Sequence, residues 1–150
     1  MIVSKKLNLI IYIKPYGDTI SLTNKVIHII KENDLISHCI IQSSNYAILT
    51  NIKKLDPNVN TSYITTNPYI NLYSIDVNFY SIKENLVTKN LVENIHNSNK
   101  KIYVWTVNNE TSMRKLINLG VDGIITNNPK LLMNIRDFTI LKNRYPLYSQ

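Results

Sequence analysis

The residues of this sequence that could carry out acid–base, nucleophilic or metal chemistry are few and widely spaced. They include three histidines, His28, His38 and His96, a single cysteine, Cys39, and ten Asp and Glu residues. No set of His, Cys and carboxylate residues has the spacing of a zinc site. Three glycines are too few to indicate a glycine-rich phosphate loop. The residue types alone therefore predict no catalytic set and no metal site.

The elements that must position these residues follow from the hydrophobic pattern, which alternates β-rich runs with amphipathic stretches. Residues 7–14 form an almost continuous apolar run that stops at Pro15, and it predicts a strand buried on both faces. Because His28 falls in an expected helix and His38 begins an expected strand, we expect structural or surface roles for them. The other elements expected in this half are helices over residues 18–33 and 45–54, a buried strand over 38–42, and extended segments over 63–65 and 74–78.

The C-terminal half has clearer boundaries. Asn109 can cap a helix over residues 110–119, and Gly120 follows where a left-handed residue is required. Asn128 and Pro129 begin a final helix. The remaining elements expected here are a helix over residues 86–97, which contains His96, and strands over 101–107 and 121–126. Strands and helices that alternate in this way imply βα units and a parallel sheet.

Length and composition are those of one domain with a single core. The chain has 150 residues, of which 44% are hydrophobic. We expect the domain over residues 1–135 and a tail over residues 136–150 that packs on it. One cysteine allows no intrachain disulfide, no apolar run is long enough for a bilayer, and the first residues lack a signal-peptide pattern. These features predict a cytoplasmic protein with no transmembrane segment.

The net charge of +7 raises the question of an anionic partner. The lysine pairs at 5–6, 53–54 and 100–101 lie near element boundaries, and no nucleic-acid recognition motif accompanies them. We therefore expect no dedicated nucleic-acid binding. The positive charge still favours a phosphate-bearing ligand or weak contact with an anionic membrane surface.

One long segment carries a family resemblance. Residues 101–132 contain Val-Trp-Thr-Val-Asn and, after a helix, Gly-Val-Asp-Gly-Ile-Ile-Thr-Asn-Asn-Pro. This segment resembles the C-terminal signature of the glycerophosphodiester phosphodiesterase family. Residues 40–44 look like that family's strand ending in Ser-Phe, and residues 7–17 look like its Leu-Asn-Ile-Glu-Ile-Lys-Pro strand. The resemblance covers residues 7–135 in the family's order.

The resemblance implies a fold and a chemistry. The fold is a (β/α)₈ TIM barrel, of which this chain would hold about the last five βα units as a partial barrel. The chemistry is the hydrolysis of a glycerophosphodiester to an alcohol and glycerol phosphate, within lipid metabolism. The family uses a divalent metal such as Ca²⁺ or Mg²⁺ and two histidines as acid and base.

This chain departs from the family pattern at its catalytic positions. The family's His-Arg, Glu-x-Asp and second His motifs precede the matched region and do not occur here. The metal-binding Glu of the next strand corresponds to Tyr12, a phenol that does not replace a carboxylate on a hard cation. Ser44 and Asn127 replace the family's aromatic and Asp. We therefore expect no catalytic residue, metal ligand or cofactor in this chain alone.

The resemblance leaves part of a pocket wall. It places Lys14 toward the phosphate and Trp105 along the substrate cleft, with Ser43 and Asn108 as hydrogen-bonding groups at the rim. Each has a plainer alternative: a solvated lysine, a core tryptophan, and turn capping by Ser43 and Asn108.

Three functional hypotheses follow. The first is a truncated family member, a pseudoenzyme that is inactive alone. The second is a partial barrel completed by self-association or by a chain that carries the missing N-terminal strands, because open sheet edges favour association. The third is a non-catalytic module that binds glycerophosphodiesters or anionic headgroups through Lys14 and Trp105.

Overall fold

The structure is a computed structural model that describes the backbone of residues 8–67, 72 and 75–144, with side chains up to Arg136. In this part of the chain, six strands alternate with five α-helices. The strands are β1 (Leu9–Tyr12), β2 (Cys39–Ser43), β3 (Asn60–Thr65), β4 (Phe79–Lys83), β5 (Lys101–Trp105) and β6 (Gly123–Ile124). The helices are α1 (Thr19–Glu32), α2 (Tyr46–Leu55), α3 (Lys89–Asn97), α4 (Glu110–Asn118) and α5 (Pro129–Arg144).

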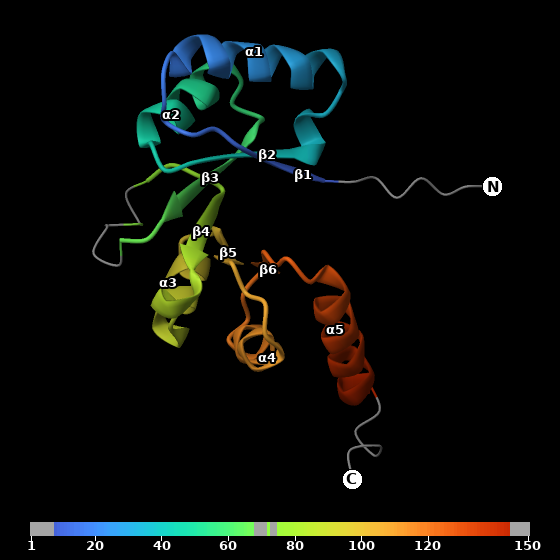
Figure 1. Ribbon diagram of the computed structural model, residues 1–150. Coiled ribbons are helices and arrows are strands. Elements are labelled where there is room, and N and C mark those ends of the chain that lie inside the picture. Colours follow the sequence, from blue (N-terminus) through green and yellow to red (C-terminus); the bar gives the residue numbers. More distant parts are fainter. Residues whose placement is uncertain (1–7, 68–71, 73–74, 145–150) are drawn as a thin grey trace, which may run out of the picture.

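The strands form one parallel sheet in the order β1-β2-β3-β4-β5-β6, so each strand pairs with the next in the chain. The helices lie on the outer, convex side of the curved sheet, and the inner side opens between β1 and β6 (Figure 1). This half-barrel confirms the expected partial barrel. It has six strands in place of about five, because β3 and β4 are both full members of the sheet.

Local signals set the helix starts as expected. The carboxylate of Asp18 accepts a hydrogen bond from the Ser21 amide at 3.0 Å, and Asn109 Oδ1 accepts one from the Ser112 amide at 2.8 Å. Gly120 has φ +80° after α4, which confirms the expected left-handed residue. The helix expected from residue 86 begins later, at Lys89, because a 3₁₀ turn (Glu84–Leu86) comes first.

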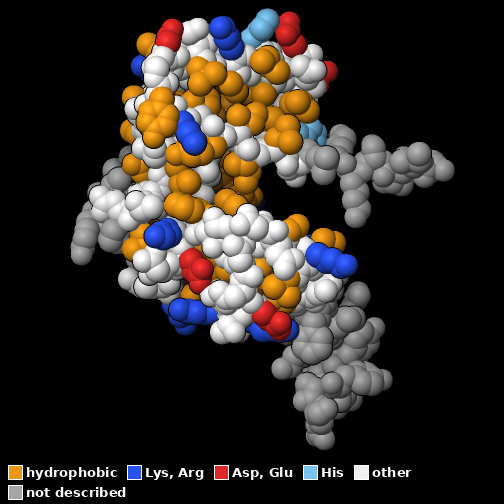
Figure 2. Space-filling model, in the orientation of Figure 1, with side chains coloured by type: hydrophobic (Ala, Val, Ile, Leu, Met, Phe, Trp, Pro, Cys, Tyr) orange, Lys and Arg blue, Asp and Glu red, His pale blue; other side chains and the backbone are white. Residues whose placement is uncertain are grey.

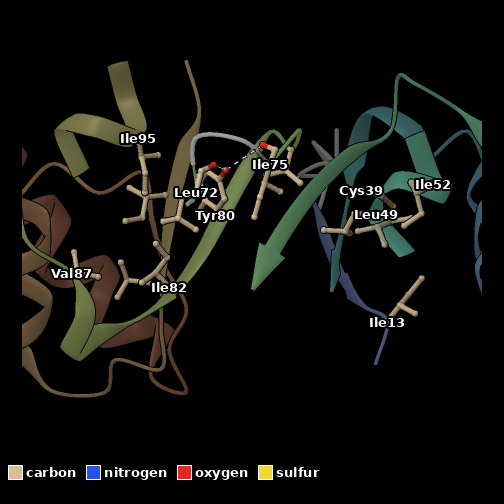
Figure 3. Close-up of a cluster of buried hydrophobic side chains, with 14 of the residues drawn as sticks. Ile13, Cys39, Leu49, Ile52, Leu72, Ile75, Tyr80, Ile82, Val87 and Ile95 are labelled. Carbon is tan, nitrogen blue, oxygen red and sulfur yellow. Dashed lines mark hydrogen bonds between the residues drawn. The ribbon is translucent and has the colours of Figure 1, made fainter. Parts of the chain in front are cut away.

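The outer face of the sheet carries the hydrophobic core. Ile82 on β4 and Val104 on β5 are fully buried, and they belong to one cluster with Leu49 on α2 and Ile95 on α3. Figure 3 shows part of this cluster, with side chains from both the strands and the helices. Burial of this face holds the helices on the sheet.

The inner face carries the other half of each strand's side chains. Phe79 and Tyr103 contact each other there with ring centroids 5.1 Å apart, and Lys101 Nζ lies 5.8 Å from the Phe79 ring. Gly123 leaves room for the Tyr103 ring, because a Cβ atom at Gly123 would lie 2.6 Å from it. Residues that the pairing register places on the same side of the sheet also belong to the inner face. They are Ile10, Tyr12, Ile40, Gln42, Asn60, Ser62, Ile64, Ser81, Lys83 and Trp105.

The two edge strands differ from expectation. We predicted that residues 7–14 form a strand buried on both faces, but Leu9, Ile10 and Tyr12 are 41–44% exposed. The prediction is wrong because β1 is an edge strand of the described sheet and pairs only with β2. At the other edge, the strand expected over residues 121–126 is only the two residues of β6, which are half-buried.

The strand β4 also differs from expectation. The sequence favoured an extended segment over residues 74–78, whereas the strand is Phe79–Lys83. The first four residues of β4 are buried, because the strand lies in the middle of the sheet. The expected tail over residues 136–150 begins within α5, and its packing lies outside the described side chains.

Candidate functional site

The carboxyl ends of the six strands meet at one edge of the half-barrel, which we call the C-terminal rim. In barrel enzymes this is the edge that holds the functional residues. The side chains considered at this rim are those of Lys14, Ser43, Lys83, Trp105 and Asn108, which lie at or just after strand ends. Figure 2 shows the molecule hollowed between the part with α1 and α2 and the part with α4 and α5, with hydrophobic side chains along the hollow.

Lys14 follows β1 at the C-terminal rim. The β-type pairing continues past β1, since the Ile13 amide donates to the Gln42 carbonyl at 2.9 Å. Tyr12 pairs with Gln42 on the inner face, so Lys14, two residues later, follows on the same face. Its side chain is exposed, and the phosphate-facing role that the resemblance implies stays a prediction.

Trp105 and Lys83 are neighbours across β4 and β5, where the register pairs them directly. The indole Nε1 of Trp105 is buried and has no hydrogen-bond partner among the described residues. Trp105 also borders a hollow of about 380 Å³ with Lys83, Thr106, Ser112 and Lys115. This N–H has almost no accessible surface, so a ligand that approaches from solvent does not reach it.

Ser43 has partners within the fold. It is fully buried, its Oγ donates to the Ile13 carbonyl at 2.9 Å, and the same oxygen accepts from the Asn45 amide at 3.2 Å. These bonds tie β1 to β2 and shape the turn into α2. They support the turn-capping alternative, and a ligand-binding role for Ser43 stays a prediction.

Asn108 joins the last two loops of the rim. Its Oδ1 accepts from the Thr126 hydroxyl at 3.2 Å and from the Asn127 amide at 2.9 Å. The side chain therefore holds the loop after β5 against the loop after β6. Its exposed position at the rim is compatible with a further contact to a ligand.

The three histidines lie away from the C-terminal rim. His28 on α1 pairs with Glu32 at 3.2 Å, and His38, just before β2, is 3.2 Å from the Asn8 side chain. His96, in the last turn of α3, lies 2.9 Å from Asp122 Oδ2. These contacts agree with the surface or structural roles expected from the sequence.

The inner face does not fit the divalent metal that the resemblance implies. Tyr12 lies beside Gln42, whose Oε1 accepts from the Ser62 hydroxyl at 3.4 Å. These donors are neutral, whereas Ca²⁺ and Mg²⁺ prefer carboxylates. Among the described residues, no three His, Cys, Asp or Glu side chains form a group that could hold a metal ion.

Burial sets the protonation of two groups near this sheet. It raises the pKa of Tyr103 on the inner face, and the Asp122 charge raises it further, so this phenol stays neutral at pH 7. Burial also raises the pKa of the Cys39 thiol on the core side of β2, which makes it a poor nucleophile. Neither group supplies acid–base chemistry to the rim.

Lys83 is the rim residue that sequence reasoning missed. It ends β4 at an inward position, two residues after Ser81 and opposite Trp105. A strand predicted over residues 79–83 would have placed Phe79, Ser81 and Lys83 on one face by their alternation. The strand was expected over residues 74–78 instead, so this signal was not used.

The parallel strands, the outer helices and the arrangement of the rim define a protein of the α/β-barrel class. The model of the glycerophosphoryl diester phosphodiesterase family matches residues 1–131. The chain therefore belongs to this family, as the sequence resemblance implied.

Individual relatives agree with this assignment. The glycerophosphodiester phosphodiesterase of Caldanaerobacter subterraneus subsp. tengcongensis is 29% identical over 123 residues, which are 76% of this chain and 49% of that protein. A glycerophosphodiester phosphodiesterase structure from Parabacteroides distasonis matches with a TM-score of 0.80 at 20% identity, covering 91% of this chain and 60% of that one.

A phosphodiesterase of Oleispira antarctica, solved with the product sn-glycerol-3-phosphate, matches with a TM-score of 0.78 at 21% identity. The match covers 88% of this chain and 56% of that one. At these identities the structures show the fold. The chain spans about half the length of the curated relatives it matches. Among the described residues, no helix is long and apolar enough to cross a membrane.

Proposed function

We propose that this chain binds a glycerophosphodiester or its glycerol phosphate product at the C-terminal rim and does not hydrolyse it by itself. One observation carries the proposal: Lys83 and Trp105 take paired inward positions at this rim, and Lys14 follows β1 at the same rim. Two ammonium groups attract a phosphate, and the indole offers an apolar surface for glycerol carbons. The Oleispira antarctica phosphodiesterase supports this ligand class, because it was solved with sn-glycerol-3-phosphate.

The absence of turnover follows from which groups face the rim. General acid–base catalysis needs a proton-transferring side chain within hydrogen-bond reach of the substrate. The histidines of this chain are paired elsewhere, with Glu32, Asn8 and Asp122. Tyr12 holds the inner-face position where the resemblance expects a metal-binding Glu. Loss of one such group typically costs several orders of magnitude in rate.

Trp105 is the only tryptophan, so its fluorescence reports directly on the rim. We expect a saturable fluorescence change when sn-glycerol-3-phosphate is added, and little change with glycerol alone. Lys14→Ala and Lys83→Ala should each weaken binding about tenfold or more, which is the loss of one charge-assisted contact. Lys25→Ala is the matched control, because this lysine is exposed on α1 away from the rim.

Two results would overturn the proposal. If fluorescence does not saturate with glycerol phosphate, or if Lys25→Ala weakens binding as much as Lys14→Ala, the rim is not the binding site. A second assay follows glycerol phosphate release from a glycerophosphodiester with Ca²⁺ or Mg²⁺ present. Robust turnover by the purified chain would refute the claim that it is inactive alone.

A second candidate function is assembly, in which the chain supplies part of a barrel that another polypeptide completes. The observation that favours it is the exposure of apolar side chains at both edges of the sheet, among them Leu9, Ile10 and Met133. Isolated exposed apolar residues are ordinary, but apolar side chains gathered at open sheet edges mark interaction sites.

A further inference from the structure

Two loops of the C-terminal rim are joined by a single side chain, that of Asn108. Asn108 lies in the loop after β5, and Thr126 and Asn127 lie in the loop after β6. Asn108 Oδ1 accepts hydrogen bonds from the Thr126 hydroxyl at 3.2 Å and from the Asn127 backbone amide at 2.9 Å. Both bonds end on the same oxygen atom. The amide nitrogen of Asn108 is therefore not used in joining the loops.

The donors around Asn108 fix the direction of its amide group. The Asn127 amide is a backbone N–H, which donates hydrogen bonds and does not accept them. The Thr126 oxygen accepts from the Asn128 amide at 3.0 Å, and its hydrogen is donated to Asn108 Oδ1. If the Asn108 amide were rotated by half a turn, its NH₂ group would face the Asn127 N–H, and two donors would oppose each other. The oxygen therefore faces the loop after β6, and the nitrogen points away from it.

The NH₂ group of Asn108 is an open hydrogen-bond donor. The residue is exposed, and its Nδ2 has no hydrogen-bond partner in the described part of the chain. An amide nitrogen carries two N–H donors and no acceptor. A negatively charged phosphate oxygen is an acceptor, and hydrogen bonds to charged oxygens are stronger than those between neutral groups. A phosphate is therefore the ligand group that this donor suits best.

The surroundings of this donor favour an anion. Asn108 comes three residues after Trp105, which pairs with Lys83 at the end of β4. The two loops, residues 106–109 and 125–128, contain no Asp or Glu that would repel an anion. The acidic residue that follows the first loop, Glu110, is paired with Arg114 at 2.7 Å. An anion at this part of the rim would meet donors and a lysine.

We propose that Asn108 Nδ2 donates a hydrogen bond to a phosphate oxygen of the ligand and that Thr126 positions it for this contact. The inference rests on the proposed binding of glycerol phosphate at this rim and adds the atom that contacts the phosphate. An Asp in place of Asn108 would keep an oxygen to join the loops, but it would set a negatively charged oxygen where the NH₂ group stands. The choice of Asn over Asp therefore determines that this place accepts an anion.

The test compares two ligands, sn-glycerol-3-phosphate and inorganic phosphate, by titration calorimetry. We expect Asn108→Asp to bind both about tenfold or more weakly, because a charge-assisted hydrogen bond is lost. Asn109→Asp is the matched control, because it adds the same charge one residue along and its Oδ1 is likewise engaged, by the Ser112 amide at 2.8 Å. The control should change each affinity by less than about threefold, as exposed charges interact weakly. Thermal unfolding checks that both variants keep the fold.

A second measurement separates ligand contact from a structural role. In the ¹⁵N-labelled chain, the side-chain NH₂ signals of Asn108 are those that disappear in Asn108→Asp. They should shift when inorganic phosphate is added, whereas the NH₂ signals of Asn109 should not. Thr126→Val removes the hydroxyl that positions Asn108 and should weaken phosphate binding about threefold or more. Thr126→Ser keeps the hydroxyl and should bind as the unaltered chain does.

Three results would overturn the inference. One is inorganic phosphate binding that Asn108→Asp leaves unchanged, because Nδ2 would then not contact the phosphate. Another is an Asn109→Asp effect as large as that of Asn108→Asp, since the added charge alone would explain the loss. The third is equal affinity of Thr126→Val and Thr126→Ser, which would refute the positioning role. If the unaltered chain binds neither ligand, the proposed function itself fails, so the two failures are distinguishable.

Discussion

Substitution of Gly123 by Ala tests the packing of the inner face between β5 and β6. The new Cβ would lie 2.6 Å and 2.8 Å from two carbon atoms of the Tyr103 ring, well inside van der Waals contact. The ring is itself packed against Phe79, with centroids 5.1 Å apart, so it must move away from a neighbour to relieve the overlap. Overpacking of this kind costs about 1–3 kcal/mol.

A smaller effect opposes this cost. Alanine restricts the unfolded chain more than glycine does, which favours the variant by roughly 0.5–1 kcal/mol in a strand. The overlap is larger, so we expect Gly123→Ala to lower the free energy of unfolding by roughly 0.5–2 kcal/mol. For a chain of this length, that corresponds to a drop in Tm of roughly 1–8 °C.

The assay is urea unfolding followed by circular dichroism, on single and double variants. Tyr103→Leu removes the ring, so in this background Gly123→Ala should lower the free energy of unfolding only slightly. The effects of the two substitutions should therefore be non-additive. Tyr103→Phe keeps the ring and should leave the Gly123→Ala penalty in place. If Gly123→Ala stabilises the protein, or costs as much in the Tyr103→Leu background as in the unaltered chain, the steric explanation is refuted.

Three more predictions concern buried polar groups. Tyr80→Phe removes a hydroxyl that donates to two loop carbonyls, and it should lower the unfolding free energy in urea by about 1–3 kcal/mol. Ser81→Ala should leave that free energy unchanged or raise it slightly, because the Ser81 Oγ is buried without a partner in the described residues. A hydrogen bond from the Asn58 amide, followed by one from Lys31, lowers the pKa of Asp56 in the folded state. Its stabilising effect is therefore complete above the unfolded value of about 3.9 and lost as the pH falls through the lower folded value. The free energy of unfolding, measured between pH 6 and 3, should therefore fall less steeply with acid for Asp56→Asn than for the unaltered chain. An equal slope in the two proteins would contradict this.

The helix boundaries that carry a capping residue were predictable because their causes are local. Asp18 and Asn109 accept hydrogen bonds from amides three residues ahead, and Gly120 has the left-handed backbone that ends a helix. Each signal acts within one turn of the chain. The family was equally accessible, because residues 101–132 carry their motif as a continuous run.

The burial of the edge strands was not predictable in this way. The apolar run over residues 7–14 has the composition of an interior strand, yet Leu9 and Ile10 are exposed. A hydrophobic pattern indicates that a strand is suited to burial. Whether the strand is buried depends on how many neighbouring strands and helices cover it. Lys83 was missed for a related reason, since its inward direction depends on the register between β4 and β5.

The sequence by itself determined the alternation of strands and helices, the capped helix starts at Asp18 and Asn109, and the membership of the phosphodiesterase family. These depend on short-range preferences and on residue order. Only the tertiary structure decided that Lys83 and Trp105 take inward positions at one rim, that Ser43 Oγ is engaged within the fold, and that β1 and β6 are the edge strands of the described sheet. The physical reason is that strand register and sheet curvature arise from contacts between segments far apart in the chain, which a local pattern does not contain.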